Sequence, residues 1–321
     1  MLEYKPYRRP FAQPLQTAHR TWSVREGIVL RLERADGSVG YGEVAPVPWF
    51  GTETLEQSVT FLKELQADPT IPVPKGLPCT QFAWDCAQGA LDEAPLTSLP
   101  VAKLLPAGKD AIAQLPHALA EGYTTFKWKI GVDFVQAEQR IATELFRHLH
   151  EHGVLRLDAN GALSREETES WLHFLRDYPV DYLEQPMAIS QEDIMAKLSH
   201  QSPVTIALDE SIASHQLLAL LAEEFTRGAF VVKPAIMGSI EVYRQWRRAH
   251  LKHRIIYSSV FETAIGTDAA IRLAALDEYS ADAIGFDTSV AADGLSYPGI
   301  ARTATSGRLT PHEKEALWNR L

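Results

Sequence analysis

The sequence predicts an α/β protein, a (β/α) TIM-type barrel with an N-terminal α+β capping domain. Three observations favour this fold class. Short apolar segments alternate with amphipathic helical segments from about residue 99 onward, the preceding residues follow a different pattern, and polar side chains recur at the ends of the apolar segments. Such alternation indicates parallel strands joined by helical crossovers. We expect the capping domain over 1–98, the barrel over 99–300, and a tail over 301–321 that packs back on the cap.

The first structural signal along the chain is a β-hairpin. Residues 28–33 and 39–44 form two apolar runs, and Asp36-Gly37 lies between them. An Asp-Gly pair between two such runs is typical of a tight hairpin turn. The N-terminal part therefore begins with paired strands.

Two helices should follow the hairpin and complete an α+β module. Their apolar spacing places them at 55–66 and 81–92, with a proline-rich break at 71–74. The only cysteines, Cys79 and Cys86, lack C-x-x-C spacing. We therefore expect two core thiols on one helix and neither a disulfide nor a thiolate metal site.

Seven short apolar segments predict the strands of the barrel. They cover 127–130, 155–158, 182–184, 206–209, 230–233, 255–259 and 283–287. Reactive side chains recur along them with gaps of 29, 26, 25 and 24 residues, at Lys129, Asp158, Glu184, Asp209 and Lys233. A barrel of roughly 250 residues uses about 30 residues for each strand and helix. These side chains thus recur about once per unit, at the C-terminal strand ends where barrel active sites lie.

Composition limits the classes of function. The 321 residues are 45% hydrophobic and 22% charged, with a formal net charge of −10 and basic residues scattered singly. Nucleic acid would therefore find no basic stripe to bind. The sequence has no run of 18 apolar residues and no N-terminal targeting pattern, so we expect a cytoplasmic protein without a membrane segment. A monomer and a small homo-oligomer both remain open.

Three acids at even barrel spacing indicate a metal site. Asp158, Glu184 and Asp209 should converge at the barrel mouth, where three carboxylates repel one another unless a hard cation neutralises them. Mg²⁺ is the simplest cation for this role. Any one of these acids alone could equally be a helix N-cap or a solvated residue at a strand end. Their spacing favours the metal.

Three lysines accompany the acids. Lys127 and Lys129 are two residues apart on one strand, so both face the same side, and Lys233 ends another strand. An isolated K-x-K on an outer sheet surface would serve solubility. Clustered ammonium groups depress one another's pKa, and we expect this effect to keep one lysine neutral as a base.

These residues belong to motifs with a recognisable pattern. The motifs are Lys127-Trp128-Lys129, Asp158-Ala159-Asn160, Glu184-Gln185-Pro186, Asp209-Glu210-Ser211 and Lys233-Pro234. With them the chain resembles the enolase superfamily, specifically its muconate-lactonising branch. It looks most like the o-succinylbenzoate synthase family, on the segments 25–27, 39–46, 232–239, 258–259 and 285–288. The resemblance covers nearly the whole chain, including the cap.

The resemblance implies a Mg²⁺-dependent carbon–oxygen lyase. Its small-molecule carboxylate substrate would be 2-succinyl-6-hydroxy-2,4-cyclohexadiene-1-carboxylate, dehydrated to o-succinylbenzoate on the route to menaquinone or phylloquinone. Lys129 would remove the α-proton and return it to the departing hydroxyl group. Lys127 would hold the substrate carboxylate, and Lys233 would stabilise the developing negative charge.

The resemblance also suggests residues that contact the rest of the substrate. Asn160 would support the metal ligands, and Ser258, Ser259 and Gly285 would form hydrogen bonds with the succinyl tail. From the residues alone, both serines could instead be helix N-caps.

The sequence alone leaves the roles of several further residues undecided. Residues 17–22, which include His19, could form a mobile lid or a plain surface loop, and the aromatic turn 48–51 could help to close the barrel mouth. Arg156 could be a site residue or part of an ion pair in the barrel core. The histidines have no zinc-binding spacing, and no glycine-rich nucleotide motif occurs.

Alternative functions remain for the same constellation. An N-acylamino-acid racemase or a dipeptide epimerase would use Lys129 and Lys233 on opposite faces of one carbon, and a muconate cycloisomerase would use the same site. A noncatalytic barrel that binds an acidic metabolite is a further alternative, but anion binding alone requires neither three acids nor a base.

Overall fold

The computed structural model describes residues 1–321 except 17–20, 150–152, 214 and 289–292. The cap is built on a three-stranded antiparallel sheet in the order β1-β2-β3. Its elements are β1 (Leu2–Gln16), β2 (Thr21–Glu33), β3 (Val39–Val44), the short 3-10 helix η1 (Pro48–Phe50), α1 (Leu55–Ala67) and α2 (Pro78–Ala87). The predicted hairpin is confirmed, and Gly37 has the left-handed φ of 82° that favours glycine in its turn.

The second helix of the cap lies earlier than predicted. It spans Pro78–Ala87 and not 81–92, because proline suits the first turn of a helix and Gly89 adopts a left-handed φ of 96° just after the end. Cys79 and Cys86 both lie on α2, buried and unpaired. The prediction of two core thiols is confirmed.

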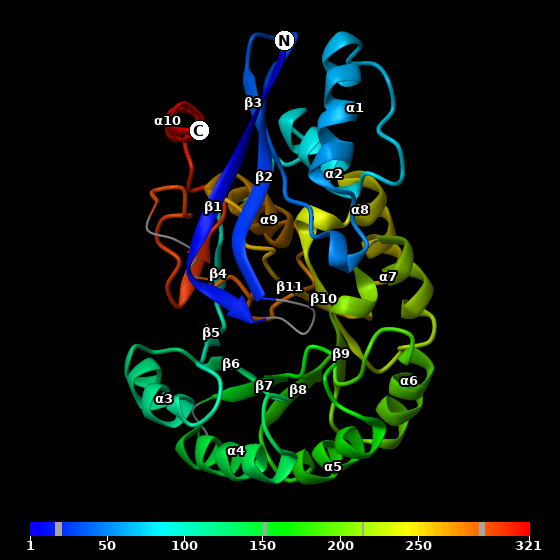
Figure 1. Cartoon of the computed structure of the whole chain (residues 1–321), viewed down its shortest axis with the longest axis vertical. Helices are drawn as coiled ribbons and strands as arrows, with labels where there is room; N and C mark the ends of the chain where they lie inside the picture. Colours follow the sequence, from blue (N-terminus) through cyan, green and yellow to red (C-terminus); the bar gives the residue numbers. More distant parts are fainter. Residues whose placement is uncertain (17–20, 150–152, 214, 289–292) are drawn as a thin grey trace.

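The barrel contains a seven-stranded parallel sheet in the order β11-β10-β9-β8-β7-β6-β5. The strands are β5 (Lys103–Leu104), β6 (Thr125–Lys129), β7 (Val154–Asp158), β8 (Val180–Glu184), β9 (Ile206–Leu208), β10 (Ala229–Val232) and β11 (Arg254–Tyr257). The intervening helices are α3 (Asp110–Ala120), α4 (Val135–Leu149), α5 (Arg165–Leu175), α6 (Glu192–Gln201), α7 (His215–Ala222), α8 (Ile240–Ala249) and α9 (Ala264–Ala275). Short 3-10 helices η2 (Glu210–Ile212) and η3 (Pro234–Ile236) follow β9 and β10. Figure 1 shows the long cap strands running toward the barrel sheet, with α3 to α6 curving around its outside.

The eighth position of the barrel differs from the prediction. A strand was expected over 283–287, but only two isolated parallel bridges form there, Val101 with Ile284 and Ser258 with Gly285. This stretch forms a single bridge with the segment on each side, whereas a regular strand pairing consists of several consecutive bridges. The bridges nevertheless connect the end of β11 to the segment before β5, so the sheet curls toward closure.

Two apolar clusters stabilise this arrangement. The larger one fills the space between sheet and helices and continues into the cap. The smaller one lies inside the barrel and consists of Tyr182, Ala207, Ala229, Val231 and Ile256. Arg156 lies beside it and is 2% exposed, with its Nε atom 2.8 Å from Asp181 and its Nη1 atom donating to the carbonyl of Ala283. Arg156 therefore forms a core ion pair, which was one of the two alternatives, and it also lines the active-site cavity, as the other alternative held.

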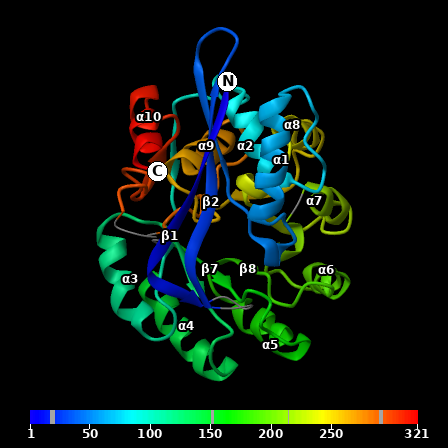
Figure 2. The ribbon, with the colours of Figure 1, turned by 45° about the horizontal axis from the view of Figure 1, so that its top comes forward.

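The C-terminal segment returns to the cap. Strand β12 (Thr303–Thr305) pairs with β4 (Ser98–Pro100), and helix α10 (Pro311–Arg320) begins at a capping box made by Thr310 and Glu313. Lys5 donates to the carbonyl of Trp318 at 3.0 Å. Figure 2 shows α10 beside the N-terminal strands. We propose the division 1–98, 99–300 and 301–321, which these contacts support.

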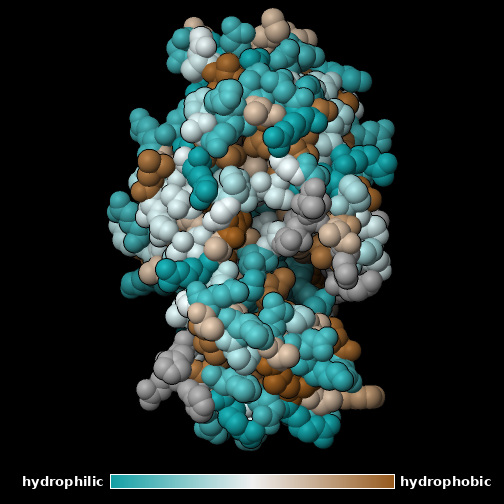
Figure 3. Space-filling model, turned by 90° about the vertical axis from the view of Figure 1, so that its left-hand side faces the viewer, coloured by the Kyte–Doolittle hydropathy of each residue, from teal (hydrophilic) through white to brown (hydrophobic). Residues whose placement is uncertain are grey.

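The surface is mostly polar on the face seen in Figure 3, where apolar residues are scattered or recessed near the middle of the molecule. None of the helices in the described ranges combines the length and apolar content needed to cross a membrane.

Candidate active site

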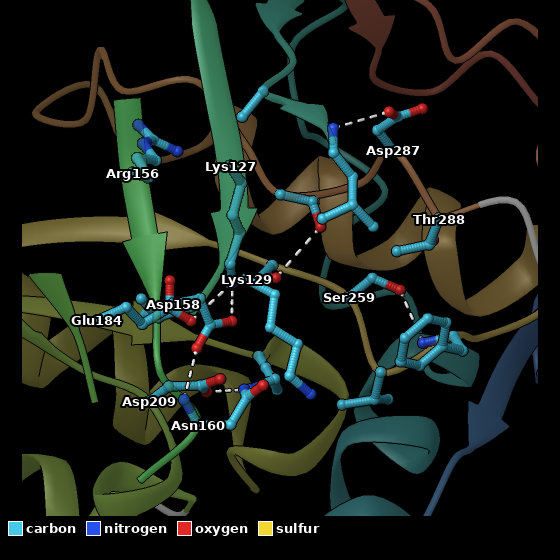
Figure 4. A pocket seen from close by; sticks show the side chains of 18 of the residues that line it. Lys127, Lys129, Arg156, Asp158, Asn160, Glu184, Asp209, Ser259, Asp287 and Thr288 are labelled. Carbon is cyan, nitrogen blue, oxygen red and sulfur yellow. Dashed lines mark hydrogen bonds and ion pairs between the residues drawn. The ribbon is translucent and has the colours of Figure 1, made fainter. Parts of the chain in front are cut away.

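One cavity of about 670 Å³ lies where the cap meets the C-terminal ends of the barrel strands. All ten residues that the sequence singled out line it: Lys127, Lys129, Asp158, Asn160, Glu184, Asp209, Lys233, Ser258, Ser259 and Gly285. They meet because parallel strands place their carboxyl ends at one edge of the sheet. Figure 4 shows Asp158, Glu184, Asp209 and Asn160 on one side, Ser259 on the other, and Lys129 between them.

Lysine ammonium groups pair with all three acids. The Nζ atom of Lys127 lies 2.8 Å from Asp158 Oδ2 and 2.7 Å from Glu184 Oε1, and Lys233 forms an ion pair with Asp209. Among the described residues, no three acidic, histidine or cysteine side chains stand in a metal-binding arrangement. The ammonium of Lys127 lies in the space between two of the acids.

The pKa values follow from burial and these pairs. Burial opposes the charge on Lys127, but Asp158 and Glu184 outweigh it and raise the pKa of the ammonium well above its ordinary value. The pKa of Lys233 is also raised, because Asp209 and Glu210 outweigh the burial of the ammonium. The expectation that clustered lysines lower one another's pKa is therefore wrong for these two lysines, whose nearest charges are carboxylates.

The pKa values of the acids in the site also depend on burial and on the nearest charges. Burial, and then the charge of Asp158, raise the pKa of Glu184 well above its ordinary value. Burial acts in the same direction on Asp158, but Lys127 and the backbone N–H of Asn160 outweigh it and hold the pKa below its ordinary value. Burial, followed by the charge of Asp209, raises the pKa of Glu210 to about 8. This crowding of negative charge favours binding of a cation.

Local structure after the strands fixes these acids. Asn160 has a left-handed φ of 45°, and its backbone N–H donates to Asp158 Oδ1 at 3.0 Å. The side-chain amide of Asn160 donates to Glu210 Oε1 at 3.2 Å. Gln185 has a φ of 33° and accepts from the backbone N–H of Asp209 at 3.0 Å. Strained residues at strand ends are typical of functional sites.

The opposite wall of the cavity comes from the loop that follows β11. The hydroxyl of Ser258 donates to the carbonyl of Gly285 at 3.1 Å, and a Cβ atom at Gly285 would lie 2.7 Å from that hydroxyl. Ser259 donates to Glu262 at 2.5 Å and accepts from the backbone N–H of Phe261 at 2.8 Å. Both serines thus anchor the loop as well as lining the cavity.

The cap contributes the roof of the cavity. Pro14, Leu15, Val47 and Phe50 line it, and the ring of Phe50 lies 4.8 Å from the ammonium of Lys233. The predicted aromatic turn 48–51 therefore reaches the site. Of the predicted lid 17–22, residues 17–20, which include His19, lie outside the described residues.

The described end of the lid segment packs in an aromatic cluster. Trp22 makes edge contacts with Phe11, Trp49 and Phe261, at centroid distances of 5.1, 4.8 and 5.5 Å. This cluster joins the cap to the loop after β11.

Sequence reasoning missed several lining residues. Glu210 is part of a quoted motif but was given no role, and Phe261, Asp287 and the segment 104–107 were not identified as lining residues. Their placement depends on loops, which carry no periodic signal. Glu210 could have been identified from its position directly after Asp209, a predicted metal ligand.

Family models agree with this geometry. One described as "Enolase C-terminal domain-like" matches residues 110–293, which is more than half of the chain, and one described as "MenC, N-terminal domain" matches residues 3–91. The o-succinylbenzoate synthase of Thermosynechococcus vestitus (strain NIES-2133 / IAM M-273 / BP-1) is 34% identical over 281 residues, covering 84% of this chain and 87% of that protein. The chain belongs to the o-succinylbenzoate synthase family of the enolase superfamily. It is therefore a member of an enzyme family, and the family inferred from the motifs is confirmed.

Solved structures support the same assignment. The o-succinylbenzoate synthase from Thermosynechococcus elongatus BP-1, which carries Mg in its active site, matches with a TM-score of 0.85 and 32% identity over 100% of this chain and 99% of that one. The L-Ala-D/L-Glu epimerase from Bacillus subtilis matches with a TM-score of 0.75 and 19% identity over 89% and 88% of the two chains. The second match shows the fold alone. The predicted enolase-like fold is confirmed.

Proposed function

We propose that this protein catalyses the Mg²⁺-dependent dehydration of 2-succinyl-6-hydroxy-2,4-cyclohexadiene-1-carboxylate to o-succinylbenzoate. The observation that carries the proposal is the convergence of the three lysines and three acids in one cavity beneath the cap. The relationship to o-succinylbenzoate synthases supports the choice of reaction.

The residues of the site fit Mg²⁺. Asp158, Glu184 and Asp209 offer the hard oxygen atoms that this cation prefers. Within the described residues, Oε2 of Glu184 and Oε2 of Glu210 are buried without a hydrogen-bond partner, so the site has unused acceptors. The ammonium groups of Lys127 and Lys233 would have to leave the acids when the cation binds.

Each side chain then has a defined task. A bound Mg²⁺ would supply positive charge to offset the charge that develops on the substrate carboxylate. Lys127, once displaced from the acids, would bind the same carboxylate. Lys233, as an ammonium group, would stabilise the developing charge from its side of the cavity.

Lys129 would perform the proton transfers. Its amine takes the proton from the ring carbon that bears the carboxylate, and the electron pair of that C–H bond becomes the new ring double bond. The bond from the adjacent ring carbon to the hydroxyl oxygen breaks, and the same proton returns to that oxygen to give water. The ring becomes aromatic, which drives the reaction.

An assay with the cyclohexadiene substrate tests the proposal. Purified protein with Mg²⁺ should form an aromatic product, and excess chelator should stop its formation. Full activity in chelator would contradict the role of the metal.

A second candidate is racemisation of an N-succinylamino acid, because Lys129 and Lys233 line the same cavity. Two-base racemisation needs both lysines to exchange protons, whereas the dehydration needs only Lys129 to do so. Deuterium incorporation from deuterated water, measured with Lys129→Ala and Lys233→Ala variants, separates the two. Rapid racemisation by the wild type with negligible dehydration would reverse the ranking.

A further inference from the structure

A carboxylate of the cap lies at the N-terminus of a barrel helix. Glu43, on β3, is 1% exposed and faces the first turn of α9. Its Oε1 atom accepts from the Tyr7 hydroxyl at 2.6 Å and from the Thr263 N–H at 2.9 Å. Its Oε2 atom accepts from the Gly266 N–H at 2.9 Å and from the Thr263 hydroxyl. Two N–H groups at the start of α9, those of Thr263 and Gly266, are thus satisfied by a side chain of the cap.

The sequence of α9 is adapted to this carboxylate. Gly266 lies within the helix, where glycine normally weakens the structure. A Cβ atom at this position would lie 2.8 Å from Oε2 of Glu43 and 2.8 Å from Cβ of Glu262. The glycine therefore gives the cap carboxylate room to approach.

The residues just before α9 form a wall of the active site. This wall is the loop 258–262, whose residues 258–261 line the cavity. Phe261 has a φ of 65°, which is unfavourable for an aromatic residue and has to be held by its surroundings. The cap holds the loop a second time, because Arg9 donates to the carbonyl of Glu262 at 3.2 Å.

We propose that Glu43 is a positioning residue for the reaction, acting through Thr263 on the loop 258–262. This inference rests on the proposed function. By fixing the first turn of α9, Glu43 holds Ser259 and Phe261 in the wall where the succinyl chain of the substrate would bind. The lysines and acids of the site come from β6 to β10, so Glu43 acts on the substrate-binding wall and not on the metal site.

A double-mutant cycle tests the inference. Glu43→Gln keeps the size of the side chain but places an N–H₂ group against backbone donors, so the loop should lose its anchor. In saturating Mg²⁺, we expect Glu43→Gln to raise KM about tenfold, the equivalent of one good hydrogen bond, with unchanged Mg²⁺ affinity. Combining it with Ser259→Ala should give less than the product of the two single effects, because both changes act on the same loop. Loss of folded protein alone would lower apparent kcat and leave KM unchanged.

Asp85 provides a matched control. It is also a cap carboxylate at the N-terminus of a barrel helix, since it accepts from the Ile240 N–H of α8 at 2.9 Å. Among the described residues, Asp85 accepts hydrogen bonds from Gln81 and Ile240, and none from the loop 258–262. The effects of Asp85→Asn and Ser259→Ala on KM should therefore multiply. If the effects of Glu43→Gln and Ser259→Ala on KM also multiplied, the inference would be overturned.

A second variant covers the case in which Glu43→Gln does not fold. Gly266→Ala keeps the charge, but its methyl group would collide with Glu43, so a purely structural role for this position predicts a less stable enzyme with an unchanged KM. A positioning role for Glu43 predicts a raised KM, because the new methyl group displaces Glu43. A folded Gly266→Ala variant with wild-type KM would overturn the inference.

Hydrogen exchange supplies a readout that does not depend on activity. In Glu43→Gln or Gly266→Ala, amides over 259–266 should exchange faster, while those over 125–129 should not change. An inactive wild type would contradict the proposed function, whereas unchanged exchange over 259–266 would contradict the role of Glu43.

Discussion

The ammonium nitrogen of Lys127 lies 2.7 Å from Oε1 of Glu184, a side chain without solvent exposure. The same nitrogen lies 2.8 Å from Asp158. Lys127 is thus the counter-charge of two buried acids. The removal of one partner of a buried ion pair leaves uncompensated charge, which is strongly destabilising.

Lys127→Met should therefore destabilise the metal-free protein. We expect the free energy of unfolding in excess chelator to fall by about 3–5 kcal/mol, measured by denaturant unfolding. Mg²⁺ should restore part of this loss, since the cation can replace the ammonium. Lys197→Met is the control, because Lys197 pairs with Asp193 at the exposed surface and its loss should cost less than about 0.5 kcal/mol. Equal losses for the two variants would refute the counter-charge role.

Metal binding should depend on the three acids. Asp209→Asn or Glu184→Gln should abolish measurable Mg²⁺ binding in a calorimetric titration while the circular dichroism spectrum is retained, because the site lies at the barrel mouth. Glu169→Gln serves as the control, since Glu169 is exposed on α5 and pairs with Arg165. Unchanged Mg²⁺ affinity in Asp209→Asn would exclude Asp209 as a ligand.

The cap segment 17–22 should act as a lid. Scrambling it should raise KM and lower kcat together without loss of Mg²⁺ binding, because the cap lines the cavity roof and excludes water from the reaction. Asp36→Asn, in the distant hairpin turn, is the control and should leave the kinetics unchanged. Wild-type kinetics in the scrambled variant would make the segment an ordinary surface loop.

His253 should make the stability of the fold depend on pH. Burial, and then the neighbouring His250 and Arg247, lower its pKa below the ordinary value of 6.5. Between its folded pKa and 6.5 the unfolded chain binds more protons, so the free energy of unfolding should rise as the pH increases through this window. His253→Gln should flatten this part of the profile, measured by unfolding at several pH values. The same slope in the variant would assign the effect to another group.

The sequence predicted the site better than it predicted the loops. Regular spacing and the adjoining K-x-K pair located six of the lining residues, since the strand ends of a parallel barrel must meet at one edge, and the family resemblance supplied the other four. The bonds of Glu43 to Thr263 span 220 residues, and no periodicity connects such distant positions. The sequence also could not predict the left-handed φ of Phe261, because an aromatic residue gives no local signal for this conformation.

The sequence also could not predict the direction of the pKa shifts of the lysines. The spacing of the lysines indicated clustered ammonium groups, but the sign of the shift depends on which charge is nearest. The structure pairs Lys127 and Lys233 with acids, so their pKa values rise. Distances of this kind follow from side-chain packing and not from strand periodicity.

The dehydration reaction and the role of Lys129 are tested most directly by one rate measurement. This is the rate of o-succinylbenzoate formation by the wild type and by Lys129→Ala, at saturating Mg²⁺ and substrate. Lys109→Ala, outside the cavity lining, is the matched control. We predict that the wild type and the control form the aromatic product at the same rate and that Lys129→Ala is slower by roughly 10²–10⁴-fold, the range expected for loss of a general acid–base group. Product formation by Lys129→Ala at the wild-type rate, or none by the wild type, would contradict the account.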